Sequence, residues 1–191
     1  MNIRITCGKV SQSSEIATLI MEAMNHECCQ NLAGSGHTLD DFHRLMTRLV
    51  ELTDSQYSYL NTICAVTDEG ALAGICVTYN GADLLKLRRR FIEGAKEAFG
   101  IDYSGMAEET KAGELYVDSL CVDARYRGQG IATRLLQAAV GRARELQLPA
   151  VGLLVDQGNP RAEALYNKVG FRFVEESAWG GHPMKHLQYK L

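Results

Sequence analysis

The sequence predicts an α/β domain built around a mixed sheet, and three observations support this. The chain has 191 residues, which suits one domain, or one domain with an insertion, and is enough to bury a real core. Segments that alternate like strands are interleaved with segments whose apolar residues follow the helical period. The composition, 46% hydrophobic and 23% charged residues, is that of an ordinary soluble protein.

The first half of the chain is expected to form strands and two helices. Ser13 is the expected cap of the first helix. Thr38 caps the second, where Asp40 and Asp41 in the first turn suit the helix dipole. The predicted elements are a strand at 3–9, a helix at 13–29, a loop at 31–37, a helix at 38–52, and a hairpin of strands at 62–66 and 71–79.

Residues 81–113 separate this hairpin from the next strand and are expected to form a helical insertion within one domain that spans 1–191. Five apolar residues in it recur at helical spacing: Leu84, Leu85, Leu87, Phe91 and Ala95. The basic run at 86–90 within it is expected to be a solvated helix face, with binding of an anionic partner as the alternative. Strand, helix, strand, helix and strand then follow to Val174, and residues 184–191 could add a last strand.

The most informative segment is 117–132, VDSLCVDARYRGQGIA, in which a buried strand passes through a glycine-containing loop directly into a helix. That helix carries its apolar face from Ile131 to Leu146. The first N–H groups of such a helix have no partner within it, and the helix dipole places positive charge there. Gly128 and Gly130 let the backbone approach closely or take a positive φ. The segment therefore predicts a phosphate site.

Two common phosphate motifs do not fit this loop. A Walker loop needs Gly-Lys-Ser/Thr, but Gly130 is followed by Ile131 and Ala132. A dinucleotide fingerprint needs glycine or alanine where Thr133 stands. A second block follows at 150–174, where a predicted strand leads to Asn159-Pro160, a helix start, and the helix stops at Gly170.

Together the two blocks resemble the GNAT superfamily of acyl-CoA N-acyltransferases. Arg125, Gly128 and Gly130 match its Arg/Gln-x-x-Gly-x-Gly/Ala pyrophosphate signature, and NPRAEALYNKVGF resembles its next block. The resemblance is strongest over 114–176. It implies a mostly antiparallel central sheet with helices on both faces, a splayed central strand pair and acetyl-CoA as co-substrate. The cofactor contacts that it implies are Leu120, Cys121, Val122, Arg127, Gly128, Gln129, Gly130, Ile131, Ala132, Thr133 and Asn159.

The resemblance also suggests catalytic groups. Tyr166 corresponds to the tyrosine that protonates the departing thiolate, and a half-buried helix tyrosine is the alternative. Asp118 is the base candidate because strand alternation is expected to place it on the face of Leu120 and Val122. Its short side chain makes a water relay plausible, Glu114 is the fallback, and a purely structural carboxylate stays open. Cys121 is expected to be inert packing rather than a nucleophile.

These features predict an acetyl-CoA-dependent N-acetyltransferase in which a primary amine attacks directly in a ternary complex. A catalytically silent acyl-CoA-binding module and a nucleotide-dependent enzyme remain the alternatives. The acceptor is expected to be a small-molecule or peptide amine. A small polyamine-like amine, attracted by a negative field, is one candidate, beside amino-acid, peptide N-terminal and protein lysine amines. The carboxylates of that field are Asp40, Asp41, Glu93, Glu97, Asp102, Glu108, Glu109, Glu114 and Asp118.

Other partners are not expected. A net charge of −3 argues against a nucleic-acid binder, and no apolar stretch approaches a membrane span. Residues 1–10 alternate like a strand and lack the apolar region of a signal peptide, and the six cysteines lack framework spacing, so we expect a cytoplasmic protein with reduced thiols. No metal site is expected, since His26, Cys28 and Cys29 match no zinc spacing. A homodimer stays open. His182 and His186, near Trp179, could reach the cleft or lie on a surface turn.

Overall fold

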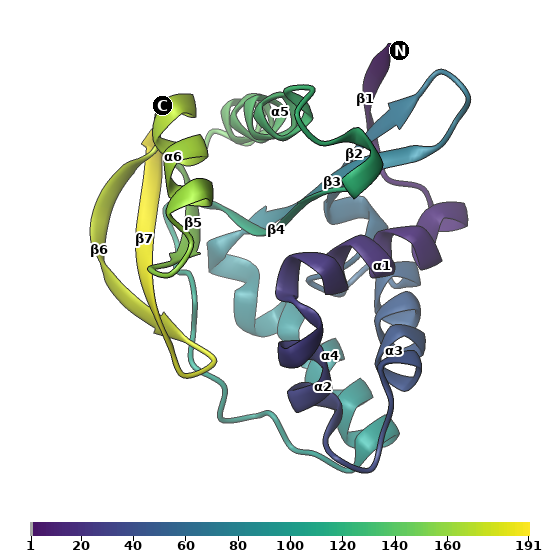
Figure 1. Cartoon of the computed structure of the whole chain (residues 1–191). Helices are drawn as coiled ribbons and strands as arrows, with labels where there is room; N and C mark the ends of the chain where they lie inside the picture. Colours follow the sequence, from purple (N-terminus) through teal and green to yellow (C-terminus); the bar gives the residue numbers. More distant parts are fainter. Residues whose placement is uncertain (1) are drawn as a thin grey trace.

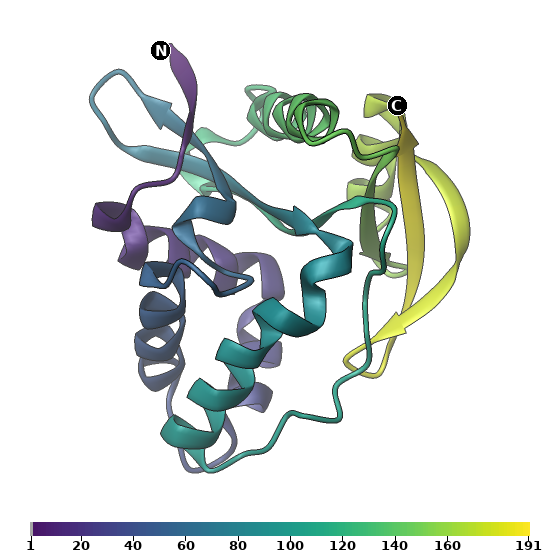
Figure 2. The same cartoon turned by 180° about the vertical axis from the view of Figure 1, so that it is seen from behind.

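A computed structural model describes residues 2–191, which form one seven-stranded sheet in the order β1-β2-β3-β4-β5-β7-β6 (Figures 1 and 2). Only β4 and β5 are parallel, and every other neighbouring pair is antiparallel. Met1, where the expected first alternating segment begins, lies outside the described residues. The strands are β1 (Ile3–Cys7), β2 (Thr62–Thr67), β3 (Leu72–Asn80), β4 (Leu115–Val122), β5 (Ala150–Asp156), β6 (Arg172–Trp179) and β7 (His182–Lys190).

Helices cover both faces of the sheet. The α-helices within the described residues are α1 (Ser13–Met24), α2 (His26–Ala33), α3 (Leu39–Glu51), α4 (Leu84–Phe99), α5 (Ile131–Glu145) and α6 (Pro160–Val169). The first four bury their apolar sides in one core, and α5 and α6 pack into a second core on the opposite face. The predicted mixed, mostly antiparallel sheet between two helical layers is therefore confirmed.

The predicted helix at 13–29 is wrong as one element, because the chain turns at Asn25. Asn25 takes a φ of 65°, which interrupts helical geometry, and its side chain accepts a hydrogen bond from the N–H of Cys28 (2.8 Å). Asparagine tolerates positive φ better than most residues and is a good helix cap, so it ends α1 and begins α2. Helix α2 then continues to Ala33, through part of the expected loop. Ser13 lies inside α1 rather than capping it.

The second predicted helix and the hairpin are confirmed. Thr38 caps α3 in a capping box with Asp41, whose carboxylate accepts the N–H of Thr38 while the Thr38 hydroxyl accepts the N–H of Asp41. Strands β2 and β3 form the hairpin across 68–71. The last strands are longer than expected, since β6 reaches Trp179 and β7 already starts at His182.

Helix α4 appears where the sequence predicts it, but its inner face is different. Leu84, Phe91 and Ala95 are buried, whereas Leu85 is 61% exposed. The buried row also includes Arg88, which forms an ion pair with Glu109, so the basic run is not simply a solvated face. Leu146, expected on the apolar face of α5, lies just beyond the helix end and is 52% exposed.

A bulge and a splay shape the middle of the sheet. In the β3–β4 register Val77 faces Ser119 and Thr78 faces Val117, so Asp118 is the extra residue of a β-bulge. Strands β4 and β5 pair only over 115–117 and 151–153, and then they diverge (Figure 1). The predicted splayed central strand pair is confirmed.

The bulge overturns one expectation from strand alternation. Val117 belongs to the core under α5, and so do Leu120 and Val122, although an unbroken strand would put odd and even residues on opposite faces. Asp118 therefore does not share the face of Leu120 and Val122. Its carboxylate lies instead against Tyr79 and Gln56.

Candidate active site

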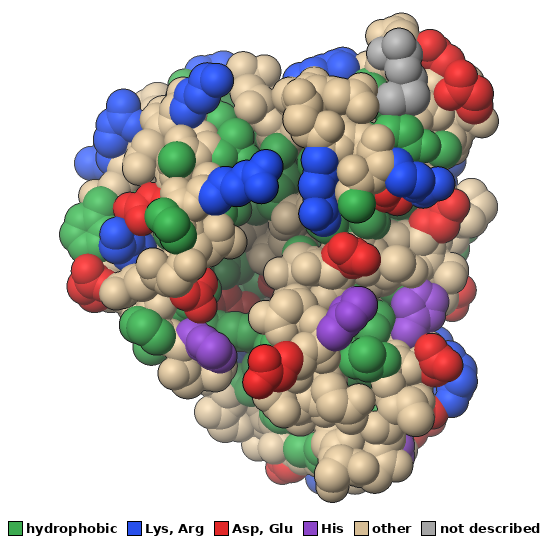
Figure 3. All heavy atoms as spheres, in the orientation of Figure 1, with side chains coloured by type: hydrophobic (Ala, Val, Ile, Leu, Met, Phe, Trp, Pro, Cys, Tyr) green, Lys and Arg blue, Asp and Glu red, His purple; other side chains and the backbone are tan. Residues whose placement is uncertain are grey.

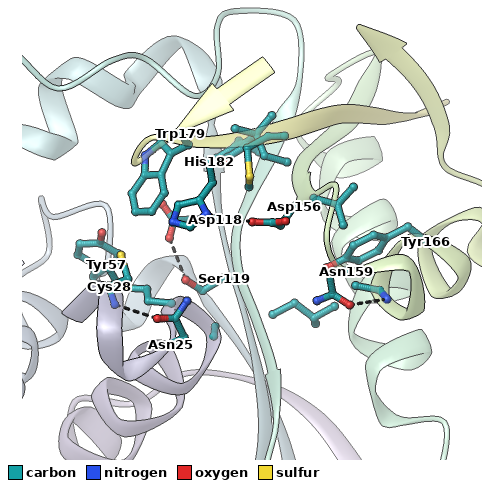
Figure 4. A pocket seen from close by; sticks show the side chains of 18 residues that line it. Asn25, Cys28, Tyr57, Asp118, Ser119, Asp156, Asn159, Tyr166, Trp179 and His182 are labelled. Atoms are coloured by element: carbon teal, nitrogen blue, oxygen red, sulfur yellow. Dashed lines mark hydrogen bonds and ion pairs between the residues drawn. The ribbon is translucent and has the colours of Figure 1, made fainter. Parts of the chain in front are cut away.

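The divergence of β4 from β5 opens a cleft of about 320 Å³ between the two halves of the sheet. Figure 3 shows the surface hollowed there, with Lys and Arg side chains along its upper rim and His, Asp and Glu side chains beside and below it. Four predicted site residues line it together: Asp118, Leu120, Asn159 and Tyr166. Figure 4 labels Asp118, Asn159 and Tyr166 together with seven further lining residues: Asn25, Cys28, Tyr57, Ser119, Asp156, Trp179 and His182.

Asp118 is held by donors on two sides. Its Oδ2 accepts hydrogen bonds from Gln56 Nε2 (3.2 Å) and the Tyr79 hydroxyl (3.1 Å), and its Oδ1 accepts one from Ser119 Oγ (2.9 Å). Burial raises the pKa of Asp118 above its usual value, and the three hydrogen bonds and Arg88 only partly oppose that effect. A carboxylate with a raised pKa is a stronger base than an ordinary exposed aspartate.

Glu114, the fallback base, does not line the cleft. Its buried carboxylate accepts hydrogen bonds from Thr110 Oγ1 (2.6 Å) and Gln188 Nε2 (2.7 Å) and meets His186 Nε2 at 2.9 Å. Burial acts to raise the pKa of Glu114, but these hydrogen bonds hold it below its usual value. Glu114, the residue before β4, and His186 of β7 thus contact each other outside the cleft, and both have a structural environment.

Tyr166 reaches the cleft from α6, whose first turn is capped by Asn159 through the N–H of Ala162 (3.1 Å). Its ring packs edge-on against Phe171 at 6.0 Å between centroids. Burial raises the pKa of Tyr166 to about 12, so the phenol keeps its proton near neutral pH. Its hydroxyl forms no hydrogen bond within residues 2–191, which leaves the proton free to face a ligand.

The phosphate loop keeps the geometry of an anion site. Gly128 and Gly130 have φ values of 78° and 75°, in the left-handed region that favours glycine. Helix α5 begins at Ile131. Its first backbone hydrogen bond runs from the N–H of Arg134 to Gly130 O (3.1 Å). The N–H groups of 131–133 therefore point out of the helix start, where an anion would receive them. These features fit the pyrophosphate of a CoA thioester.

The two loop arginines are less available than the sequence suggests. Arg125 pairs with Asp123 at 2.7 Å, so its charge is compensated within the loop. Arg127 donates from Nε to Val122 O (3.0 Å), and its guanidinium lies 3.8 Å from Glu22. Backbone N–H groups, more than arginine side chains, are therefore available to an anion at this loop.

Replacing Gly130 with valine should weaken binding of acetyl-CoA by about tenfold or more, because a β-branched residue cannot hold the φ of 75° without strain of order 1–3 kcal/mol. Isothermal titration calorimetry measures this affinity. The matched control is Gly141→Ala, inside α5 at a position with ordinary φ and open space, which should bind normally. Equal affinities in a folded Gly130→Val variant would contradict the assignment of the loop.

The register of β4 with β3 fixes the direction of its backbone N–H groups. Asp123 N–H donates to Ala73 O on β3 (3.0 Å), so alternation turns Cys121 N–H toward β3 and the N–H groups of Leu120 and Val122 toward the splay. Leu120 and Val122 thus fit the predicted role of binding a thioester oxygen, and Cys121 does not. The Cys121 thiol is buried and its pKa is raised to about 11, consistent with packing.

Several cleft residues could not be found from the sequence. Tyr57 comes from an irregular segment without a periodic signal, and so does Gln56, which contacts Asp118; Asp156 ends a strand like many others. The sequence left open whether the histidines near Trp179 reach the cleft or lie on a surface turn. Trp179 and His182 line the cleft, whereas His186 does not.

Several carboxylates of the predicted negative field are paired with basic side chains, and of that set only Asp118 lines the cleft. Glu93 contacts Arg89 and Arg90, Glu97 contacts Arg48, and Glu109 contacts Arg88. Asp41 caps α3 and pairs with Arg44. The carboxylates that do line the cleft are Asp118 and Asp156.

Comparison with known proteins agrees with this geometry. The chain is 27% identical over 140 residues to a spermine/spermidine N(1)-acetyltransferase of Bacillus subtilis, covering 62% of this chain and 92% of that one. It is 35% identical over 93 residues to a mycothiol acetyltransferase of Propionibacterium freudenreichii, covering 48% of this chain and 29% of the other.

Solved structures agree as well. A crystal structure described as an acetyltransferase superposes with a TM-score of 0.82 at 26% identity, covering 98% of each chain. An N-acetyltransferase from Staphylococcus aureus Mu50 shares the fold with a TM-score of 0.80 at 21% identity, covering 97% of this chain and 100% of that one. The sequence profile of the Acetyltransferase (GNAT) family matches residues 31–171. The chain therefore belongs to the GNAT acetyltransferase family.

Proposed function

We propose that this protein transfers the acetyl group of acetyl-CoA to a primary amine by direct attack in a ternary complex. The observation that carries the proposal is the meeting of Asp118 and Tyr166 in one cleft, beside the outward N–H groups of β4. The cleft lies between the strands that lead to the two predicted cofactor blocks. Orientation of both reactants in such a cleft supplies much of the rate enhancement of an acyl transfer.

Acetyl-CoA supplies an activated thioester when it is bound, and the residues of this chain manage its protons and charge. Leu120 and Val122 N–H groups stabilise negative charge on the carbonyl oxygen. Asp118 accepts the proton that the amine loses, directly or through water, as the N–C bond forms. Tyr166 donates its proton to the sulfur as the C–S bond breaks. Both side chains then return to their starting states through solvent.

A catalytically silent acyl-CoA-binding module is the alternative. It would need neither an oriented carboxylate nor a free phenol in the cleft, and this chain has both. The Cys121 environment also disfavours an acyl-enzyme route, since burial raises the pKa of its thiol to about 11.

We further propose a cationic amine as acceptor, now on the evidence of the cleft rather than of the 81–113 segment. Asp118 and Asp156 contribute carboxylates, and Tyr57 and Trp179 contribute aromatic surfaces that suit a cation. The name of the Bacillus subtilis relative, a spermine/spermidine acetyltransferase, is consistent with this class.

The KM for a diamine acceptor should rise as ionic strength increases from about 0.01 to 1 M, because salt screens the attraction of the cleft carboxylates. Steady-state release of the CoA thiol with a panel of amines measures it. Asp156→Asn should lower the salt dependence, and a zwitterionic amino acid of similar size serves as the comparison acceptor. Preference for the neutral acceptor, or rates indifferent to salt, would remove the cationic-acceptor proposal.

A further inference from the structure

A layer of buried polar side chains lies behind Asp118, on the side away from the cleft. Tyr79 of β3 is only 3% exposed, and its hydroxyl lies 3.1 Å from Asp118 Oδ2 and 3.5 Å from Glu109 Oε1. One hydroxyl is thus placed between two carboxylates. It carries a single hydrogen, so it can donate to only one of them at a time.

Glu109 belongs to the loop after α4 and is neutralised by Arg88 of that helix. The side chains of both residues are almost fully buried, at 6% and 3% exposure, and they form an ion pair through Arg88 Nη2 and Glu109 Oε2. Arg88 Nη1 also donates to the backbone carbonyls of Met106 (3.3 Å) and Ala107 (2.9 Å). The second oxygen of Glu109 is left facing Tyr79. A buried pair with these additional hydrogen bonds holds its geometry firmly.

The position of the Tyr79 hydrogen therefore depends on the charge of Asp118. While Asp118 is ionised and the charge of Glu109 is compensated by Arg88, the hydrogen is directed to the closer oxygen, on Asp118. When Asp118 takes a proton, the hydroxyl can turn to Glu109 Oε1. Tyr79 consequently stabilises the ionised form of Asp118 more than the neutral form.

We propose that Tyr79, backed by the buried Arg88–Glu109 pair, is a positioning residue that keeps Asp118 ionised and oriented for proton abstraction. This rests on the proposed role of Asp118 as the base. Through Arg88 and Glu109, the 81–113 segment then supports the site, although its charged side chains do not line the cleft. Tyr79 acts through Asp118 and does not line the cleft.

Other groups near Asp118 do not replace this contact. Tyr57 and Tyr116 are close enough to interact electrostatically with Asp118. Burial, and the charge of Asp118 as well, raise the pKa values of both phenols, so they stay neutral. The remaining titratable groups that line the cleft with Asp118 are Cys28 of α2, Asp156 of β5, Tyr166 of α6 and His182 of β7. None of these donates a hydrogen bond to the Asp118 carboxylate, whose side-chain donors within residues 2–191 are Gln56, Tyr79 and Ser119.

Tyr79→Phe should raise the pKa of Asp118 by about one to two pH units, because it removes a hydrogen bond that favours the charged form. Two readouts measure this: the acid limb of kcat with saturating substrates, and ¹³C NMR titration of the Asp118 carboxyl, assigned with Asp118→Asn. The control is Tyr103→Phe, which removes a hydroxyl hydrogen bond to Leu32 O (2.8 Å) within the same segment. It should leave both readouts unchanged.

Glu109→Gln should move the pKa of Asp118 in the opposite direction. The positive charge of Arg88 is then uncompensated, and the new amide can donate to the Tyr79 oxygen, which commits the Tyr79 hydrogen to Asp118. If this variant does not fold, the Tyr79→Phe titration decides alone. An Asp118 carboxyl that titrates unchanged or at lower pH in Tyr79→Phe overturns the proposal. If Tyr79→Phe shifts the pKa of Asp118 in the NMR titration but the unaltered protein transfers no acetyl group, then the coupling between Tyr79 and Asp118 is upheld. The proposed function is then refuted instead.

Discussion

Replacing Tyr166 with phenylalanine should lower kcat by about 100-fold or more while the affinity for acetyl-CoA changes little. The substitution removes only the hydroxyl that faces the cleft, and the ring keeps its edge-on contact with Phe171. Without that proton the sulfur must leave as a thiolate or take its proton from water. Steady-state kinetics with saturating acetyl-CoA measure kcat, and calorimetry measures the affinity.

The matched control for this prediction is Tyr189→Phe. Tyr189 also packs edge-on against Phe171, at 5.9 Å between ring centroids, but it does not line the cleft. This variant should keep its kcat, which separates loss of a proton donor from loss of a phenol in the same aromatic cluster. A kcat within about twofold of the unaltered protein for Tyr166→Phe would show that the proton comes from elsewhere.

Asp118→Asn should lower kcat by about 100-fold or more and abolish its acid limb. The carboxylate must be ionised to accept a proton, so the activity of the unaltered protein should fall as the pH drops through the pKa of Asp118. Because burial raises that pKa, the fall should begin above the pH at which an exposed aspartate titrates. Rates measured at saturating substrates across pH report the group in the ternary complex.

Glu114→Gln is the comparison for the second prediction, since it alters the carboxyl group of the residue directly before β4. Its amide can keep some of the contacts to Thr110, Gln188 and His186, so we expect lower thermal stability but an unchanged acid limb. If the limb disappears with Glu114→Gln and survives in Asp118→Asn, then the proposed base is wrong and the carboxylate behind the cleft must act through a relay.

Local sequence patterns determined the fold class and both predicted cofactor blocks. The strand-loop-helix at 117–132 depends on nearby residues alone: apolar strand residues, glycines at positive φ, and an amphipathic helix. The same is true of Asn159 as a helix cap and of the capping box at Thr38. Such features involve residues a few positions apart, so a single sequence reveals them.

The surroundings of the predicted residues were decided only by the tertiary structure. The bulge at Asp118 arises from pairing with β3, and it changed which face Asp118 occupies. In the sequence, Arg88 looks like one of several surface cations. In the structure it forms a buried ion pair with Glu109, which lies 21 residues later in the chain. Charge pairing between distant residues cannot be inferred from spacing, because it depends on which side chains the packed elements bring within a few ångströms. For that reason the sequence could name Asp118 and Tyr166, and only the fold could bring them into one cleft and supply Tyr79.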